Sequence, residues 1–201
     1  MTDLESETYQ SYVPIEIAQK MLEVLPLERI HPKDRFILIP TARSGNLFLA
    51  AIDRLSQMTD IPTETQSDYL NDRVISKEFC VKELKSFNTE TLTKIGFNPR
   101  VIVANYSCAL ERELEALQQF IDCLDSGSQF AFILPSSFMF QKNGVLSNCD
   151  PLDGKCKLFE VWQLPADVIT DKGACVIIGV TGQFQEHDPV IFRDIKLLVN
   201  E

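Results

Sequence analysis

Two short polar segments, each directly after an apolar run, hold the residues of this sequence that could do chemistry. Residues 36–49 read as an apolar stretch, a proline, a Ser-Gly pair and a second apolar stretch. Residues 105–108, Asn-Tyr-Ser-Cys, follow a run of branched apolar residues. A strand that passes through a tight turn into a helix points backbone N–H groups and the positive helix end at one place. In α/β proteins that place, at the carboxyl end of a parallel strand, binds nucleotides and anions.

The first segment predicts a strand over residues 36–39, ended by Pro40 because proline has no backbone N–H for the ladder. A helix is expected over residues 47–55, with Asn46 as its N-cap. The second segment predicts a strand over residues 100–104 and a turn that begins at Asn105. A simpler interpretation of Asn105 is that it caps a helix beginning near Ala109.

Hydrophobic periodicity predicts that further strands and helices alternate along the chain. Too few residues separate the last two strands for a packed helix, so we expect antiparallel neighbours at the sheet edge. Residues 59–73 are polar and are interpreted as a long loop with at most a short strand. Residues 190–199 could form an edge strand or a tail helix. The remaining predictions are helices over 14–25 and 111–124 and strands over 74–80, 129–134, 158–164 and 174–181.

This order of elements indicates an α/β protein with a mostly parallel sheet, an antiparallel edge and helices on both faces. The chain has 201 residues, of which 45% are hydrophobic, enough for one domain with a substantial core. We place that domain at residues 12–201, after a polar, acidic leader of residues 1–11.

The charge balance is acidic. Lys and Arg number 19 against 29 for Asp and Glu, which gives a net charge of −10. No cluster of Lys and Arg occurs along the sequence. Such a surface does not attract polyanions by itself, so contact with DNA would require a local basic patch or a partner protein.

The six cysteines include no CxxC pair, and most lie in apolar segments. This pattern favours reduced, buried thiols and a cytoplasmic location. The two histidines are far from the cysteines in sequence, so no metal site is expected. No apolar run approaches the length needed to span a membrane, and no membrane partner is expected.

The order and spacing of these segments resemble the catalytic core of N6-adenine DNA methyltransferases, particularly those of type I restriction–modification systems. The similarity covers about residues 9–182 and implies a Rossmann-like methyltransferase fold. The matching segments are Tyr12-Val13-Pro14 at the opening helix, residues 39–45 at the cofactor loop, residues 74–79, residues 103–108 at the catalytic strand, Leu134-Pro135-Ser136 and Gln163-Leu164-Pro165.

The resemblance implies S-adenosylmethionine as cofactor and adenine in DNA as substrate. In the family, the asparagine of the catalytic tetrapeptide accepts hydrogen bonds from the adenine amino group and an aromatic residue stacks on the flipped base. By this similarity Asn105 would position the amine and Tyr106 would contact the base. The residues expected to line the cofactor pocket are Pro14, Pro40, Thr41, Ser44, Gly45 and Glu78.

The departures from the family pattern fall on the residues that do the chemistry. Ile39 replaces an acidic residue that organises the cofactor loop, and Arg43 replaces its central glycine. Cys108 stands where the aromatic residue should stack. The family's second strand has little room before Val74, and only Glu64 and Asp68 lie where its ribose-binding carboxylate is expected.

Three hypotheses remain open from the sequence. The chain is a divergent adenine methyltransferase, or a degenerate methyltransferase fold retained as a binding or regulatory module. A third hypothesis is a different nucleotide or anion binder that uses Arg43 at the helix start. Under the first two, DNA would be reached only through a specificity or methyltransferase partner subunit, because 201 residues leave no room for a target-recognition region.

Overall fold

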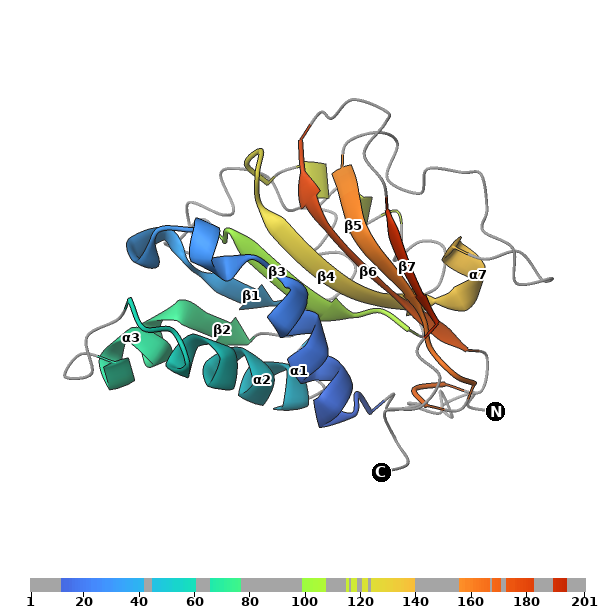
Figure 1. Ribbon diagram of the computed structural model, residues 1–201, viewed down its shortest axis with the longest axis horizontal. Helices are drawn as coiled ribbons and strands as arrows, with labels where there is room; N and C mark the ends of the chain where they lie inside the picture. Colours follow the sequence, from blue (N-terminus) through green and yellow to red (C-terminus); the bar gives the residue numbers. More distant parts are fainter. Residues whose placement is uncertain are drawn as a thin grey trace, which may run out of the picture.

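The computed structural model describes residues 12–41, 45–60, 66–76, 99–107, 115, 117–118, 121–122, 124–139, 156–166, 168–170, 173–182 and 190–194. In this part of the chain, one sheet of seven strands has the order β2-β1-β3-β4-β6-β5-β7 (Figure 1). The elements are α1 (Ile15–Val24), η1 (Leu27–Arg29), η2 (Pro32–Asp34), β1 (Ile37–Ile39), α2 (Gly45–Ser56), α3 (Gln66–Arg73), β2 (Val74–Ser76), β3 (Val101–Asn105), β4 (Gln129–Pro135), α7 (Ser136–Met139), β5 (Cys156–Gln163), β6 (Ala174–Thr181) and β7 (Ile191–Asp194).

The sheet is mostly parallel, as the sequence predicts. Strands β2, β1, β3 and β4 run parallel, and β6 pairs antiparallel with both β4 and β5. The predicted antiparallel pairing of β5 with β6 toward one side of the sheet is confirmed, and β7 pairs parallel with β5 as the outermost strand. For residues 191–194 the edge strand is therefore the alternative found, and the rest of that prediction, residues 195–199, lies outside the described residues.

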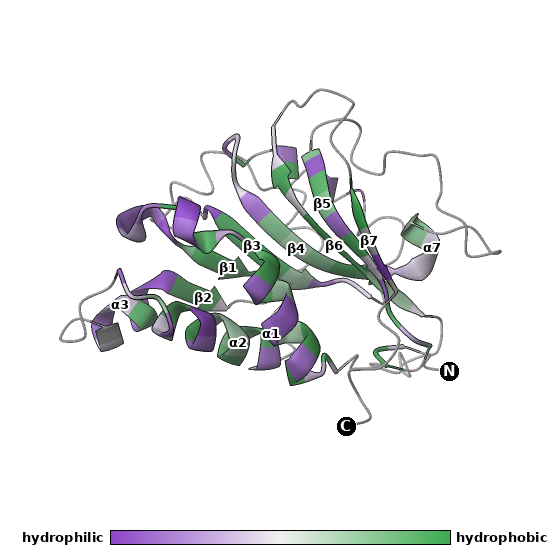
Figure 2. Cartoon of the chain, viewed as in Figure 1, coloured by the Kyte–Doolittle hydropathy of each residue, from purple (hydrophilic) through white to green (hydrophobic). Residues whose placement is uncertain are grey.

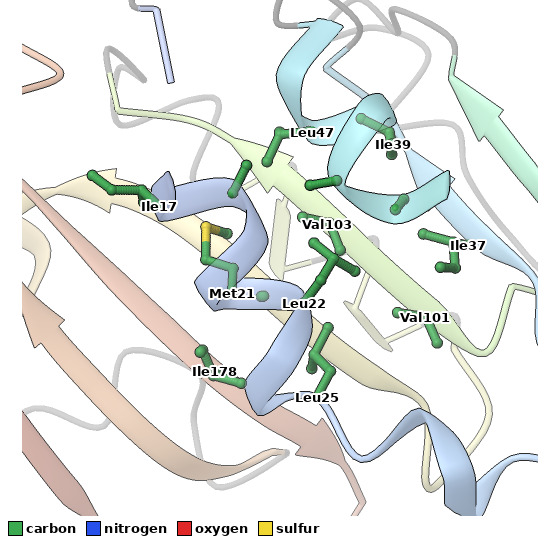
Figure 3. Close-up of a cluster of buried hydrophobic side chains, with 14 of the residues drawn as sticks. Ile17, Met21, Leu22, Leu25, Ile37, Ile39, Leu47, Val101, Val103 and Ile178 are labelled. Carbon is green, nitrogen blue, oxygen red and sulfur yellow. The ribbon is translucent and has the colours of Figure 1, made fainter. Parts of the chain in front are cut away.

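Helices cover both faces of the sheet, because successive side chains of a strand point to opposite faces. Helices α1 and α2 cover one face (Figure 3), where Ile37, Ile39, Val101 and Val103 meet buried residues of the two helices. On the other face, Leu117 and Ile121, both among the described helical residues, pack on the alternate residues of the same strands. Figure 2 shows the hydrophobic strands and the hydrophilic outer surfaces of the helices.

Three local predictions are corrected. The long loop expected over residues 59–73 contains helix α3, whose polar sequence hides it from periodicity analysis. Strand β2 lies beside β1, so the position of the family's second strand is filled rather than lost. Asn46 is not the N-cap of α2: the helix begins at Gly45, and Asn46 Nδ2 donates to the carbonyl of Val13 at 2.8 Å, joining the starts of α1 and α2.

The pairing of β5 with β6 is irregular at one point. The register shifts between Leu158 and Glu160, which marks a β-bulge in β5. Gly179 of β6 lies opposite, and a Cβ there would meet the backbone carbonyl of Lys157 and stand 2.7 Å from the ring of Phe130. Only glycine allows the strands to approach this closely.

Among the described residues, no helix combines the length and apolar character that a bilayer span requires.

Candidate functional site at the carboxyl edge of the sheet

The carboxyl ends of β1 and β3 bring the two predicted site segments together. The strands are neighbours in the sheet, with Leu38 paired with Ile102. Beyond the ladder, the backbone N–H of Asn105 donates to the hydroxyl oxygen of Thr41 at 2.8 Å. The proposed cofactor loop and the proposed catalytic turn are therefore joined directly.

Asn105 ends β3 and is half-buried. Its side-chain oxygen Oδ1 accepts a hydrogen bond from the backbone N–H of Ser107 at 3.0 Å, the geometry of an Asx turn. This oxygen is the one that, by family resemblance, would receive the adenine amino group. The helix that Asn105 was expected to cap, near Ala109, lies outside the described residues.

Tyr106 is 8% exposed and belongs to the core on the face of Leu117, opposite α1 and α2. Its backbone N–H donates to the carbonyl of Ile133 at 2.7 Å, which continues the pairing of β3 with β4. Its ring packs edge-on against Phe132, with centroids 6.5 Å apart and planes at 72°. A ring held this way presents little free face to a ligand.

The residues expected around the cofactor are only partly described. Pro14 precedes α1 and is half-buried, Pro40 is buried, and Thr41 bonds Asn105. Gly45 is the first residue of α2, and a Cβ built on it would have no neighbour within 4 Å, so space is open at the start of this helix. Ser44, Glu78 and Arg43 lie outside the described residues, and their predicted roles stay predictions.

Ile39 decides how well the described residues fit S-adenosylmethionine. The backbone frame for such a ligand is present, because β1 leads into the N-terminus of α2. Ile39, however, is fully buried and packs in the core with Leu47 of α2 (Figure 3). At the position where the family resemblance expects a carboxylate, the structure has a buried aliphatic side chain, which offers no charge to a cofactor.

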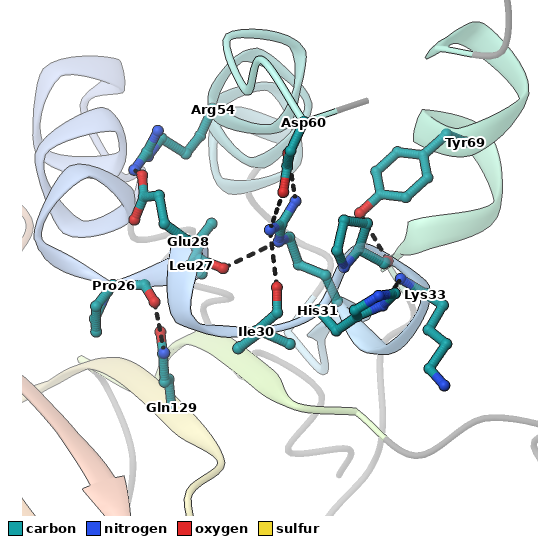
Figure 4. Close-up of polar contacts among 12 residues, drawn as sticks. Pro26, Leu27, Glu28, Ile30, His31, Lys33, Arg54, Asp60, Tyr69 and Gln129 are labelled. Atoms are coloured by element: carbon teal, nitrogen blue, oxygen red, sulfur yellow. Dashed lines mark hydrogen bonds and ion pairs between the residues drawn. The ribbon is translucent and has the colours of Figure 1, made fainter. Parts of the chain in front are cut away.

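The opposite, amino edge of the sheet holds a polar network that the sequence did not reveal (Figure 4). The fully buried Arg35 donates from Nε to the carbonyl of Leu27 at 3.0 Å and from Nη2 to that of Ile30 at 2.8 Å. It also forms two bonds with Asp60, at 3.2 and 2.8 Å. These bonds lower the pKa of Asp60 below its ordinary value of 3.8.

A buried acid, Glu160, fixes the edge strand. Trp162 Nε1 donates to Glu160 Oε2 at 2.7 Å, and Arg193 of β7 donates to both carboxylate oxygens at 2.6 and 3.0 Å. Burial alone raises the pKa of Glu160, but the hydrogen bonds from Arg193 and Trp162 outweigh it, and the net shift is downward. Both networks are structural, and neither lies at the carboxyl edge of the parallel strands.

Comparison with known proteins supports the fold and leaves the function open. No protein-family model matches the sequence. The curated proteins also contain no match. Many solved structures, by contrast, share its fold.

Three of these structures illustrate the fold. The M protein of the type I restriction enzyme EcoKI superposes with a TM-score of 0.60 at 16% identity over 89% of this chain and 45% of its own. A Listeria monocytogenes protein assigned to the class I S-adenosylmethionine-dependent methyltransferases gives 0.62 at 10% identity, over 96% and 68%. A modification subunit assigned to a type I restriction enzyme of Vibrio vulnificus YJ016 gives 0.59 at 14% identity, over 99% and 50%.

The chain therefore has the Rossmann-like fold of S-adenosylmethionine-dependent methyltransferases, including type I modification subunits, as the motif order predicts. It spans about half the length of the two modification subunits.

Proposed function

We propose that this chain is a methyltransferase-fold module of a DNA-modification assembly that has lost the chemistry of adenine methylation and serves as a binding or regulatory subunit. The observation that carries the proposal is the burial of Ile39 at the end of β1. A cofactor loop needs a carboxylate there, and a fully buried aliphatic side chain packed against α2 offers neither charge nor space.

The catalytic turn supports the same conclusion. The ring of Tyr106 lies in the core against Phe132, while Asn105 Oδ1 accepts the N–H of Ser107 with one of its two lone pairs. For Tyr106 to stack on a flipped adenine, its ring would have to leave a buried site, which costs the free energy of burying a large aromatic side chain, about 2 kcal/mol or more. The fold keeps its packing without these residues taking part in chemistry.

A partner is part of the proposal. The net charge of the chain is −10. A polyanion such as DNA would be repelled by most of this surface. We therefore propose that a specificity or methyltransferase subunit supplies contact with DNA, in the cytoplasm where such an assembly would act.

The alternative, an active but divergent S-adenosylmethionine-dependent adenine methyltransferase, has specific observations in its favour. The bond between Asn105 and Thr41 holds the two motif segments together, and the start of α2 at Gly45 is open. Glu78 follows β2 by two residues, and β2 lies beside β1, where the family places its ribose-binding carboxylate. In this alternative Glu78 takes that role.

Calorimetric titration of the chain with S-adenosylmethionine, and with its demethylated product, separates the two. The module proposal expects no binding at about 1 mM ligand, which corresponds to less than about 4 kcal/mol of binding free energy. A matched pair of variants locates any binding that is seen. Gly45→Trp fills the open start of α2, and Leu49→Trp adds the same side chain one turn later, on an exposed position. Micromolar binding that Gly45→Trp abolishes and Leu49→Trp preserves would overturn the proposal in favour of the alternative.

A further inference from the structure

A cleft of about 490 Å³ opens at the amino edge of the sheet, at the opposite end of the parallel strands from the proposed cofactor site. Its walls come from the η1–η2 segment, from the residues just before β3 and β4, and from the first residues of β5. Its volume is within the range of small-molecule sites, about 300 to 1,000 Å³. None of the hypotheses drawn from the sequence uses this region.

Three cations from distant parts of the sequence line the cleft: Arg29, Arg100 and Lys157. Asp34 is the one acidic residue among its lining residues. Arg100 also donates from Nη1 to Asp125 at 3.2 Å, which uses one of the five N–H donors of its guanidinium. On a chain of net charge −10, this is a local positive site that would attract anions.

The position of Arg29 is fixed by the network beneath it. Arg29 is the last residue of η1 and lies in sequence between Leu27 and Ile30. The carbonyls of Leu27 and Ile30 both accept hydrogen bonds from the buried Arg35. The backbone that carries this cation is therefore anchored to the core. A preformed cationic site loses less entropy on binding than a flexible one.

The interior of the cleft is suited to a ring. Pro26, Ile30 and Phe159 contribute apolar surface, and the ring of Phe159 is half-buried. Gln129, 4% exposed, also lines the cleft and donates from Nε2 to the carbonyl of Pro26 at 2.9 Å (Figure 4). Its Oε1 is buried and accepts no hydrogen bond from the described part of the chain. A buried acceptor of this kind favours a ligand that carries an N–H group.

We propose that this cleft binds the phosphate groups of a nucleotide, either free or as one unit of a nucleic-acid strand. Arg29, Arg100 and Lys157 hold the phosphate, which Arg binds in a bidentate manner. The base lies against the apolar wall near Phe159 and donates an N–H toward Gln129. Inorganic phosphate would use only the cations, so it should bind more weakly than a nucleotide.

Binding to the full chain tests the proposal with three probes: inorganic phosphate, adenosine monophosphate and a labelled single-stranded oligodeoxythymidylate. Arg29→Gln and Lys157→Gln should each weaken nucleotide binding about tenfold, the loss of one charge-assisted contact. The matched control is Lys20→Gln, an exposed lysine of α1 with the same loss of charge, which should change affinity less than about twofold.

The source of the nucleotide follows from the comparison of probes. Binding of the monophosphate would assign a free nucleotide. Tighter binding of the oligonucleotide, with a salt slope reduced by about one in Arg29→Gln, would assign a nucleic-acid strand.

Four results would overturn the proposal. The first is equal affinity for inorganic phosphate and the monophosphate, and the second is equal weakening of nucleotide binding by Lys20→Gln and Arg29→Gln. The third is the absence of binding for every probe at about 10 mM. The fourth is loss of nucleotide binding in Gly45→Trp, because that result would place the ligand at the other edge of the sheet.

Discussion

The two edges of the sheet place their polar groups differently. At the carboxyl edge of β1 and β3, the described bonds join backbone N–H groups to uncharged side-chain oxygens: Ser107 donates to Asn105 Oδ1, and Asn105 donates to Thr41 Oγ1. At the amino edge, a fully buried Arg35 makes four hydrogen bonds to groups that lie up to 25 residues away in sequence. A cationic cleft lies next to this network.

At the carboxyl edge, β1 is followed in sequence by α2, and Ile39 at the end of β1 is fully buried. The amino edge has fixed side chains, a cavity and a concentration of charge, the features from which binding sites are built. Under the two proposals made above, the amino edge and not the carboxyl edge is the one that binds a ligand.

Returning a carboxylate to the carboxyl edge is the strongest test of this contrast. We expect Ile39→Asp to lower the free energy of unfolding by about 4 kcal/mol, because a buried charge without a partner costs several kcal/mol. Urea unfolding followed by the fluorescence of Trp162, the sole tryptophan and fully buried, measures the loss. Ile39→Val should cost only about 1 kcal/mol. Unchanged stability together with new S-adenosylmethionine binding would show that the edge is still open.

Breaking the amino-edge network should cost slightly less. We expect Arg35→Ala to lower the free energy of unfolding by about 3 kcal/mol, since it removes a buried charge and leaves two carbonyls and Asp60 without their donor. The same urea titration of Lys20→Ala, an exposed ion pair with Glu23, should show a change below about 0.5 kcal/mol. Equal effects of the two substitutions would remove the distinction between a structural network and surface charge.

The pH dependence of stability sharpens the assignment of that network. The hydrogen bonds from Arg35 depress the pKa of Asp60, so their contribution is present above the ordinary value of 3.8 and is lost as the pH falls through the lower folded value. Because the Asp60 side chain is 46% exposed, solvent screens the interaction, and Asp60→Asn should cost only about 0.5 to 1 kcal/mol at pH 7 and nothing once the pH is below the folded pKa. In an Arg35→Ala background this pH-dependent difference should vanish. Its persistence there would assign the shift to another group.

A similarly small effect is expected at the carboxyl edge. Thr41→Val removes the acceptor for the backbone N–H of Asn105 and should cost about 1 kcal/mol. Hydrogen exchange of that amide should accelerate about fivefold, while Thr41→Ser, which keeps the hydroxyl, should leave it nearly unchanged. An amide equally protected in all three chains would show that this bond does not join the two segments.

The sequence predicted the sheet well because buried parallel strands have a simple pattern. Strands β3, β4 and β6 are apolar along nearly their whole length, which indicates strands buried on both faces. Their order along the chain then predicted the fold class. Helix α3 was missed because its sequence is polar, and its partly buried residues Tyr69 and Leu70 pack on a core that only the folded chain provides.

The site was harder to predict, since its residues meet only in the folded chain. Arg35, at the start of a strand, has the appearance of a surface charge, and its partner Asp60 lies 25 residues away. The cations of the cleft are at positions 29, 100 and 157, so no basic cluster exists along the sequence. The bond between Asn105 and Thr41 likewise spans 64 residues.

Gly179 restricts how this sequence can vary. The bulged part of β5 lies so close to Gly179 that a Cβ at this position would clash with the backbone carbonyl of Lys157. Lys157, which makes this contact, and Phe159 two residues later form one wall of the amino-edge cleft. In a saturation library selected for folded protein, position 179 should return glycine alone. The absence of a side chain at Gly179 thus determines the positions of Lys157 and Phe159 in the cleft wall.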